Sequence, residues 1–147
     1  MCRGIKLTDH SGIEKRIEFP HPKAALPIQS VEGQIKWLRW GNNLEEKEGG
    51  FFIGGWARQI SLEQGKWDKL KPEPVDLVAD EFLSRDPERN PHWIDIPPGH
   101  AIKGIIATHH DERRVYVITT EPPEEYAWMN DRWPLIAPIE GHSASSN

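Results

Sequence analysis

Cys2 is the only cysteine in this chain of 147 residues, and it directly follows Met1. If Met1 is removed, Cys2 becomes a 1,2-aminothiol, with ordinary pKa values of about 7.7–8.0 for the amine and about 8.5 for the thiol. Such an amine attacks an aldehyde to give an imine, and the neighbouring thiol then closes a thiazolidine ring. Because the ring-opened sugar of an abasic site in DNA is an aldehyde, Cys2 is a candidate nucleophile for trapping it. The alternative is a structural cysteine near the start of a strand.

The charge balance limits how this chain could bind a nucleic acid. It has 18 basic and 23 acidic residues and a net charge of −5, which argues against wrapping DNA by bulk electrostatics. A local basic groove remains possible. The seven tryptophans are either packing residues of a β-rich domain or, in part, platforms on which exposed bases stack.

Composition also narrows the class of protein. A single cysteine excludes an internal disulfide framework and a multi-cysteine zinc site. There is no apolar run near the roughly 20 residues of a spanning helix, and no secretory leader pattern, so we expect a cytoplasmic protein. We expect one domain over residues 1–140, a disordered polar tail over 141–147, and no cofactor. His109 and His110 are read as exposed loop residues or, alternatively, as metal ligands with Asp111 or Glu112.

The pattern of apolar residues predicts mostly strands. The clearest unit is a hairpin over residues 101–121, with two β-branched runs joined by the polar stretch HHDERR. Residues 75–82 are expected to form one buried strand, and Ser61 with Gln64 makes a weak capping box for a short helix. We therefore predict an α+β fold with an antiparallel-dominated sheet or partly closed barrel and a few short helices.

Seven segments occur in an order that is typical of one known family. They are MCRG at 1–4, AALPIQ at 24–29, LRWGN at 38–42, WARQIS at 56–61, LVADEFLSR at 77–85, VITTEP at 117–122 and NDRWPLI at 130–136. Together they resemble the SOS response-associated peptidase (SRAP) family, whose members shield abasic sites in single-stranded DNA through a cysteine at position 2. The resemblance covers about residues 2–137.

The resemblance implies a catalytic set of which this chain keeps one member. The family combines the cysteine with an asparagine, a glutamate and a histidine, and the matching positions here hold Cys2, Trp56, Ser84 and Asn130. Without the glutamate and the histidine, proton transfer should slow by about a hundredfold or more. The resemblance also implies DNA contacts by Arg39, Arg58 and Arg132 and base stacking on Trp40 or Trp56.

Two functions remain open at this stage. The first is a divergent SRAP-like protein that binds single-stranded or abasic-site DNA and forms a covalent crosslink through Cys2. The second is an inactive binding module that keeps the scaffold and holds a protein or a nucleic acid. A thiol hydrolase ranks below both, because no histidine and acid can be assigned to Cys2.

Overall fold

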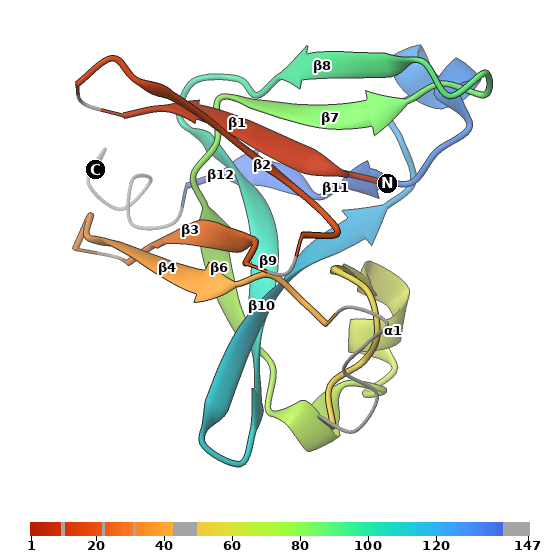
Figure 1. Cartoon of the computed structure of the whole chain (residues 1–147). Helices are drawn as coiled ribbons and strands as arrows, with labels where there is room; N and C mark the ends of the chain where they lie inside the picture. Colours follow the sequence, from red (N-terminus) through yellow and green to blue (C-terminus); the bar gives the residue numbers. More distant parts are fainter. Residues whose placement is uncertain (10, 22, 31, 43–49, 140–147) are drawn as a thin grey trace, which may run out of the picture.

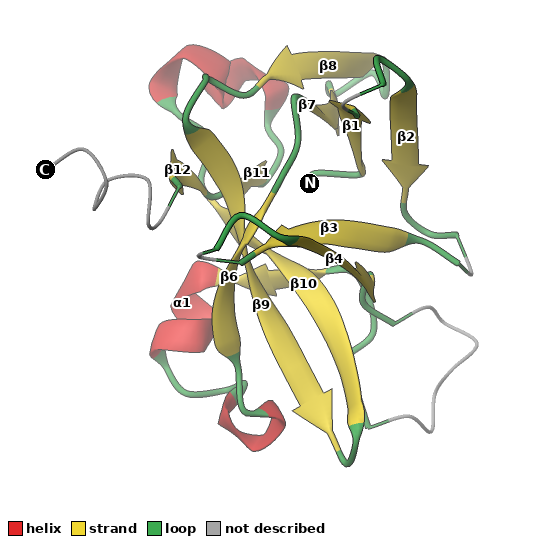
Figure 2. Cartoon of the chain, turned by 90° about the vertical axis from the view of Figure 1, so that its left-hand side faces the viewer, coloured by secondary structure: helices red, strands yellow, loops and turns green. Residues whose placement is uncertain are grey.

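The computed structural model of the chain describes residues 1–9, 11–21, 23–30, 32–42 and 50–139. Two sheets face each other across a shared core (Figures 1 and 2). The first sheet is antiparallel, in the order β2 (Glu14–Glu18), β1 (Gly4–Thr8), β7 (Glu81–Arg85) and β8 (Pro91–Asp95). It holds the N-terminal end of the chain against β7.

The second sheet has eight strands and is not closed. Its main path is β11 (Trp133–Pro134), β10 (Glu112–Thr120), β9 (His100–His109), β6 (Glu73–Leu77), β3 (Ala25–Gln29) and β4 (Ile35–Arg39). In addition, β12 (Ile136–Pro138) pairs with β9, and β5 (Trp56–Arg58) pairs in parallel with β10. The predicted β-rich α+β class is confirmed, because the only helical elements described are α1 (Gln59–Glu63) and two 3₁₀ turns, η1 (Asp68–Leu70) and η2 (Glu124–Met129).

The predicted hairpin is present as β9 and β10, but its turn is shorter than expected. Glu112 lies opposite His109, so only His110 and Asp111 form the turn, and the arginines of HHDERR belong to β10. His110 adopts a positive φ of 54°, which a tight two-residue turn requires.

Two further expectations about the elements were wrong. The expected strand over 75–82 is divided, because β6 ends at Leu77 and β7 begins at Glu81 in the other sheet. The crossing between them is fixed by Asp80, whose carboxylate accepts a hydrogen bond from the Thr8 amide at 2.8 Å. Ser61 lies inside α1, which begins at Gln59 after Arg58 and has no side-chain cap.

The core lies between the two sheets. Ile5 and Phe82 of the first sheet pack in one cluster with apolar residues of the second, which include Leu26, Leu77, Ile102, Val115 and Val117. A second cluster, built on Trp67 and Tyr116, packs on the opposite face of β9 and β10. Within the described residues no helix is long and apolar enough to cross a membrane. The predicted tail over 141–147 lies outside the described residues.

Candidate functional site

Cys2 is fully buried, contrary to the exposed position that its place in the chain suggests. Its exposure is 0 %, and its thiol donates a hydrogen bond to the carbonyl of Gly4, with Sγ and O 3.5 Å apart. Burial raises the pKa of the Cys2 thiol to about 12, against smaller lowering effects from the Gly4 hydrogen bond and the terminal ammonium. Strand pairing explains the burial, since β1 has neighbours on both edges and the Arg3 amide donates to Leu83 at 2.9 Å.

Aromatic side chains pack over Cys2. The indole nitrogen of Trp56 donates a hydrogen bond to the carbonyl oxygen of Cys2 over 2.6 Å. Phe19 contacts Trp56 edge-on with ring centroids 5.0 Å apart, and both belong to the partly buried shell of the cluster that contains Cys2. Trp56, where the resemblance implies an asparagine, therefore lies against Cys2.

Ser84 lies near the N-terminus, where it contacts Asp131, the residue that follows Asn130. Ser84 is fully buried and donates a hydrogen bond to Oδ2 of Asp131 at 3.1 Å. The other carboxylate oxygen of Asp131 forms an ion pair with the terminal ammonium of Met1. Asn130 takes a left-handed conformation with φ 51° at the end of η2, which turns the chain toward this contact. Cys2, Trp56, Ser84 and Asp131, which follows Asn130, thus lie near the N-terminus, where their contacts are structural hydrogen bonds and an ion pair.

Two of the residues expected to contact DNA have structural partners instead. Trp40 is 2 % exposed and its indole nitrogen donates to Gly55 at 2.8 Å, so its ring has no open face for a base. Arg132 binds the Glu121 carboxylate at 2.9 Å and the Thr119 carbonyl at 3.0 Å.

The other two expected arginines lie on different strands. Arg39 ends β4, and burial together with the charge of Arg114 lowers its pKa. Arg58 is exposed on β5, two residues after Trp56, and remains available to a ligand.

A pocket of about 410 Å³ beside the N-terminus contains three arginines that the motifs did not single out. We call it the arginine pocket; it is lined by Arg3, Arg85, Asp86, Pro87, Arg89, Met129, Asn130 and Asp131. Arg85 and Arg89 stand out in the sequence only as charges near a turn. Pairing of β1 with β7 brings Arg3 to them, which local patterns do not predict.

A second hollow, of about 610 Å³, lies between the outermost strands of the two sheets. We call it the Trp37 groove; it is lined by residues 16–21, 23–25 and Trp37. Trp37 of β4 is 43 % exposed, and the ammonium of Lys15 on β2 lies 5.4 Å from its ring centroid. Lys23 adds a cation to the lining and Glu18 an anion.

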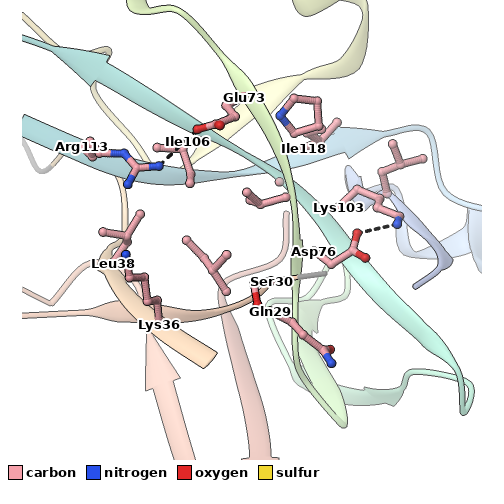
Figure 3. A pocket seen from close by; sticks show the side chains of 15 residues that line it. Gln29, Ser30, Lys36, Leu38, Glu73, Asp76, Lys103, Ile106, Arg113 and Ile118 are labelled. Atoms are coloured by element: carbon pink, nitrogen blue, oxygen red, sulfur yellow. Dashed lines mark hydrogen bonds and ion pairs between the residues drawn. The ribbon is translucent and has the colours of Figure 1, made fainter. Parts of the chain in front are cut away.

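The third hollow, of about 520 Å³, lies among β3, β4, β6, β9 and β10 (Figure 3). Its charged side chains largely satisfy one another. Lys103 pairs with Asp76 at 2.5 Å and Arg113 pairs with Glu73 at 3.2 Å, as the dashed lines in Figure 3 show. A charged ligand would have to compete with these pairs.

No group of three or more His, Cys, Asp or Glu side chains in the described ranges is placed to hold a metal ion. The rings of His109 and His110 contact each other with centroids 4.3 Å apart at the hairpin turn, and no acidic side chain of the described residues completes a metal site with them. Comparisons of the chain with family models, with curated proteins and with solved structures found no match.

Proposed function

We propose that this chain is a non-covalent binding module for single-stranded DNA, built on a scaffold of the SRAP type in which Cys2 has become a core residue. The observation that carries the proposal has two parts: Cys2 is buried, and the nearby Trp37 groove is open to solvent. The burial of Cys2 argues against covalent chemistry. The groove offers the two elements that single-strand binding needs, a stacking ring and cations along the backbone.

The state of Cys2 argues against covalent trapping of an aldehyde. With a pKa of about 12, roughly one Cys2 thiol in 10⁵ is ionised at pH 7. Ser84 and Asn130 cannot carry protons near neutral pH, and Ser84 is already bound to Asp131. The Cys2 amine is in the peptide bond to Met1, so imine formation there would first require loss of Met1, whose ammonium is held by Asp131.

The Trp37 groove fits unpaired bases better than a duplex. An exposed indole can stack on a base only when that base has a free face, and each such contact contributes about 1–3 kcal/mol. Lys15 and Lys23 lie beside Trp37 and supply charge for phosphates despite the net charge of −5. Both lysines are exposed, so they can turn toward a bound strand.

The groove adjoins the Cys2 site and the arginine pocket. Phe19 lines the groove, packs on Trp56, and donates its amide hydrogen to the carbonyl of Arg3 at 2.9 Å. Arg3 in turn lines the arginine pocket. Residues of the groove therefore contact residues of both neighbouring features.

Fluorescence anisotropy tests the proposal. The probe is a ten-nucleotide oligothymidine with a 5′-hydroxyl and a 3′-fluorescein, titrated with the full chain at low and moderate salt. We expect salt-dependent binding that weakens about tenfold in Trp37→Ala. Trp128→Ala is the matched control, because Trp128 is 57 % exposed on η2 and lies outside the groove lining. Absence of binding at low salt, or equal loss in both variants, would contradict the proposal.

A denaturing gel tests the non-covalent part separately. The protein and a Cys2→Ala variant are incubated with single-stranded DNA that carries an abasic site, and intact mass gives the state of Met1. We expect free DNA with both proteins. A shifted band that depends on Cys2 would restore the covalent function.

A further inference from the structure

We infer that the arginine pocket binds a phosphate monoester, either the terminal phosphate of a nucleic-acid strand or a small phosphorylated molecule. This ligand class goes beyond the groove-based function proposed above and does not depend on it. The inference rests on three arginines that line one pocket without side-chain partners among the described residues, and on how the acidic groups beside them are already engaged.

The arginines come from separate parts of the first sheet. Arg3 precedes β1, Arg85 ends β7, and Arg89 lies in the turn between β7 and β8, with a positive φ of 70°. That turn is held by the Asp86 carboxylate, which accepts hydrogen bonds from the amides of Glu88 and Asn90, both at 2.9 Å. Arg89 is therefore carried on a short, well-bonded turn, and Arg85 directly precedes that turn.

None of the three guanidinium groups has an ion-pair or hydrogen-bond partner among the described residues. In contrast, Arg113, Arg114 and Arg132 are each paired with a glutamate. Three like charges gathered without a counterion repel one another, and an anion bound among them would relieve that repulsion. Arginine is also the side chain best suited to bidentate recognition of phosphate oxygens.

Both carboxylates of the pocket have their own partners. Asp86 binds the His92 ring nitrogen at 2.8 Å, and this bond is the main cause that lowers the pKa of Asp86. Asp131 is neutralised by the Met1 ammonium and also accepts the hydrogen bond from Ser84. The pocket therefore keeps a net positive charge even though two acidic residues line it.

The size and charge of the pocket indicate a phosphate monoester. Its volume of about 410 Å³ falls within the range of small-ligand sites, which is about 300–1,000 Å³. A monoester carries a charge of about −1.5 to −2 at pH 7 and presents three terminal oxygens. An internal phosphodiester carries one charge and two such oxygens, and so satisfies fewer of the three guanidinium groups.

The experiment compares two oligothymidines that differ only at the 5′ end. Both have ten nucleotides and a 3′-fluorescein; one carries a 5′-phosphate and the other a 5′-hydroxyl. We expect the full chain to bind the phosphorylated strand about tenfold more tightly or better, because each hydrogen bond to a charged group contributes about that factor. Inorganic phosphate should remove this preference, and sodium chloride of equal ionic strength should not.

Arg85→Gln and Arg89→Gln test the residues, since both side chains are exposed and can change without disturbing the core. Each should reduce the preference for the 5′-phosphate about tenfold. Arg113→Gln is the matched control, because it removes one arginine charge from a different surface. Circular dichroism and thermal melting of each variant establish that it is folded.

The outcomes separate the sources and test the inference. If the phosphorylated strand is preferred and the preference is lost in Arg85→Gln but kept in Arg113→Gln, the ligand is a strand terminus. If calorimetry shows that inorganic phosphate binds with the same dependence on Arg85 but no terminus is preferred, the ligand is a small phosphorylated molecule. Equal weakening of both strands, or no binding of inorganic phosphate and no preference, would overturn the assignment to a monoester. The effect of Trp37→Ala on the 5′-hydroxyl strand tests the groove proposal, whereas the effect of the 5′-phosphate and of Arg85→Gln tests this one, so the two proposals fail separately.

Discussion

Ser84 donates a hydrogen bond to Asp131 over 3.1 Å, at a position where the resemblance to the SRAP family implies a glutamate. The second oxygen of the same carboxylate holds the Met1 ammonium. These contacts join β7, the segment after η2 and the chain terminus. The cluster therefore fixes the N-terminus in the fold, and its polar groups are used for stability.

Asp131→Asn should destabilise the fold by about 1–2 kcal/mol at neutral pH, because it removes the ion pair to Met1 and weakens the acceptor for Ser84. The measurement is the free energy of unfolding in urea. Glu121→Gln is the control, since Glu121 is 85 % exposed and an exposed ion pair contributes little. Equal stability of Asp131→Asn and the unmodified chain would contradict the structural role of this cluster.

Cys2 should react with a thiol reagent far more slowly in the folded chain than in the unfolded one. At pH 8 a thiol of pKa about 12 is ionised about a thousandfold less than a free cysteine, and Trp56 and Phe19 also pack on its cluster. Rates of alkylation by iodoacetamide, followed by mass spectrometry with and without urea, measure this difference. Trp56→Ala should raise the rate of Cys2 alkylation in the folded chain about tenfold or more, because it removes a ring that packs on the Cys2 cluster. A fast reaction of the folded, unmodified chain would show that Cys2 is accessible.

The stability that Cys2 contributes should fall at alkaline pH. Its pKa of about 12 in the folded state exceeds the value of about 8.5 expected when unfolded, so the unfolded chain ionises first as pH rises. The contribution is complete below pH of about 8.5 and is lost between there and about 12, by up to about 1.4 kcal/mol per pH unit. Burial also raises the pKa of Tyr116, so the informative quantity is the stability difference between the unmodified chain and Cys2→Ala. Parallel curves of stability against pH for the two proteins would contradict the prediction.

Trp40→Phe should lower stability and leave DNA binding unchanged. The substitution removes the hydrogen bond to Gly55 and part of a buried ring whose centroid lies 5.3 Å from that of Phe19. We expect the free energy of unfolding to fall by about 1–3 kcal/mol. Trp128→Phe, at an exposed position, should change neither property. Thermal melting and the anisotropy titration described above measure the two effects. A loss of affinity for DNA in folded Trp40→Phe would show that Trp40 belongs to the DNA-binding surface.

Local patterns predicted the elements whose residues carry their own signal. The β9–β10 hairpin followed from two β-branched runs, and the β-rich class followed from many short extended segments. The division of residues 75–82 between two sheets could not be predicted in this way. Both halves are apolar, and only long-range pairing decides that Leu77 belongs with β9 and Phe82 with β1.

For the candidate site, too, some properties follow from the sequence and others only from the tertiary structure. The sequence alone determined that Cys2 is the one thiol, and the resemblance implies that Trp56, Ser84 and Asn130 stand where groups that would help it are expected. The tertiary structure decided that Cys2 is closed, that Trp40 is a core residue, and that Arg3 meets Arg85 and Arg89 in one pocket. Residue type determines what chemistry a side chain could perform. Exposure and pKa depend on neighbours brought together by strand pairing across some 80 residues, which no local pattern contains.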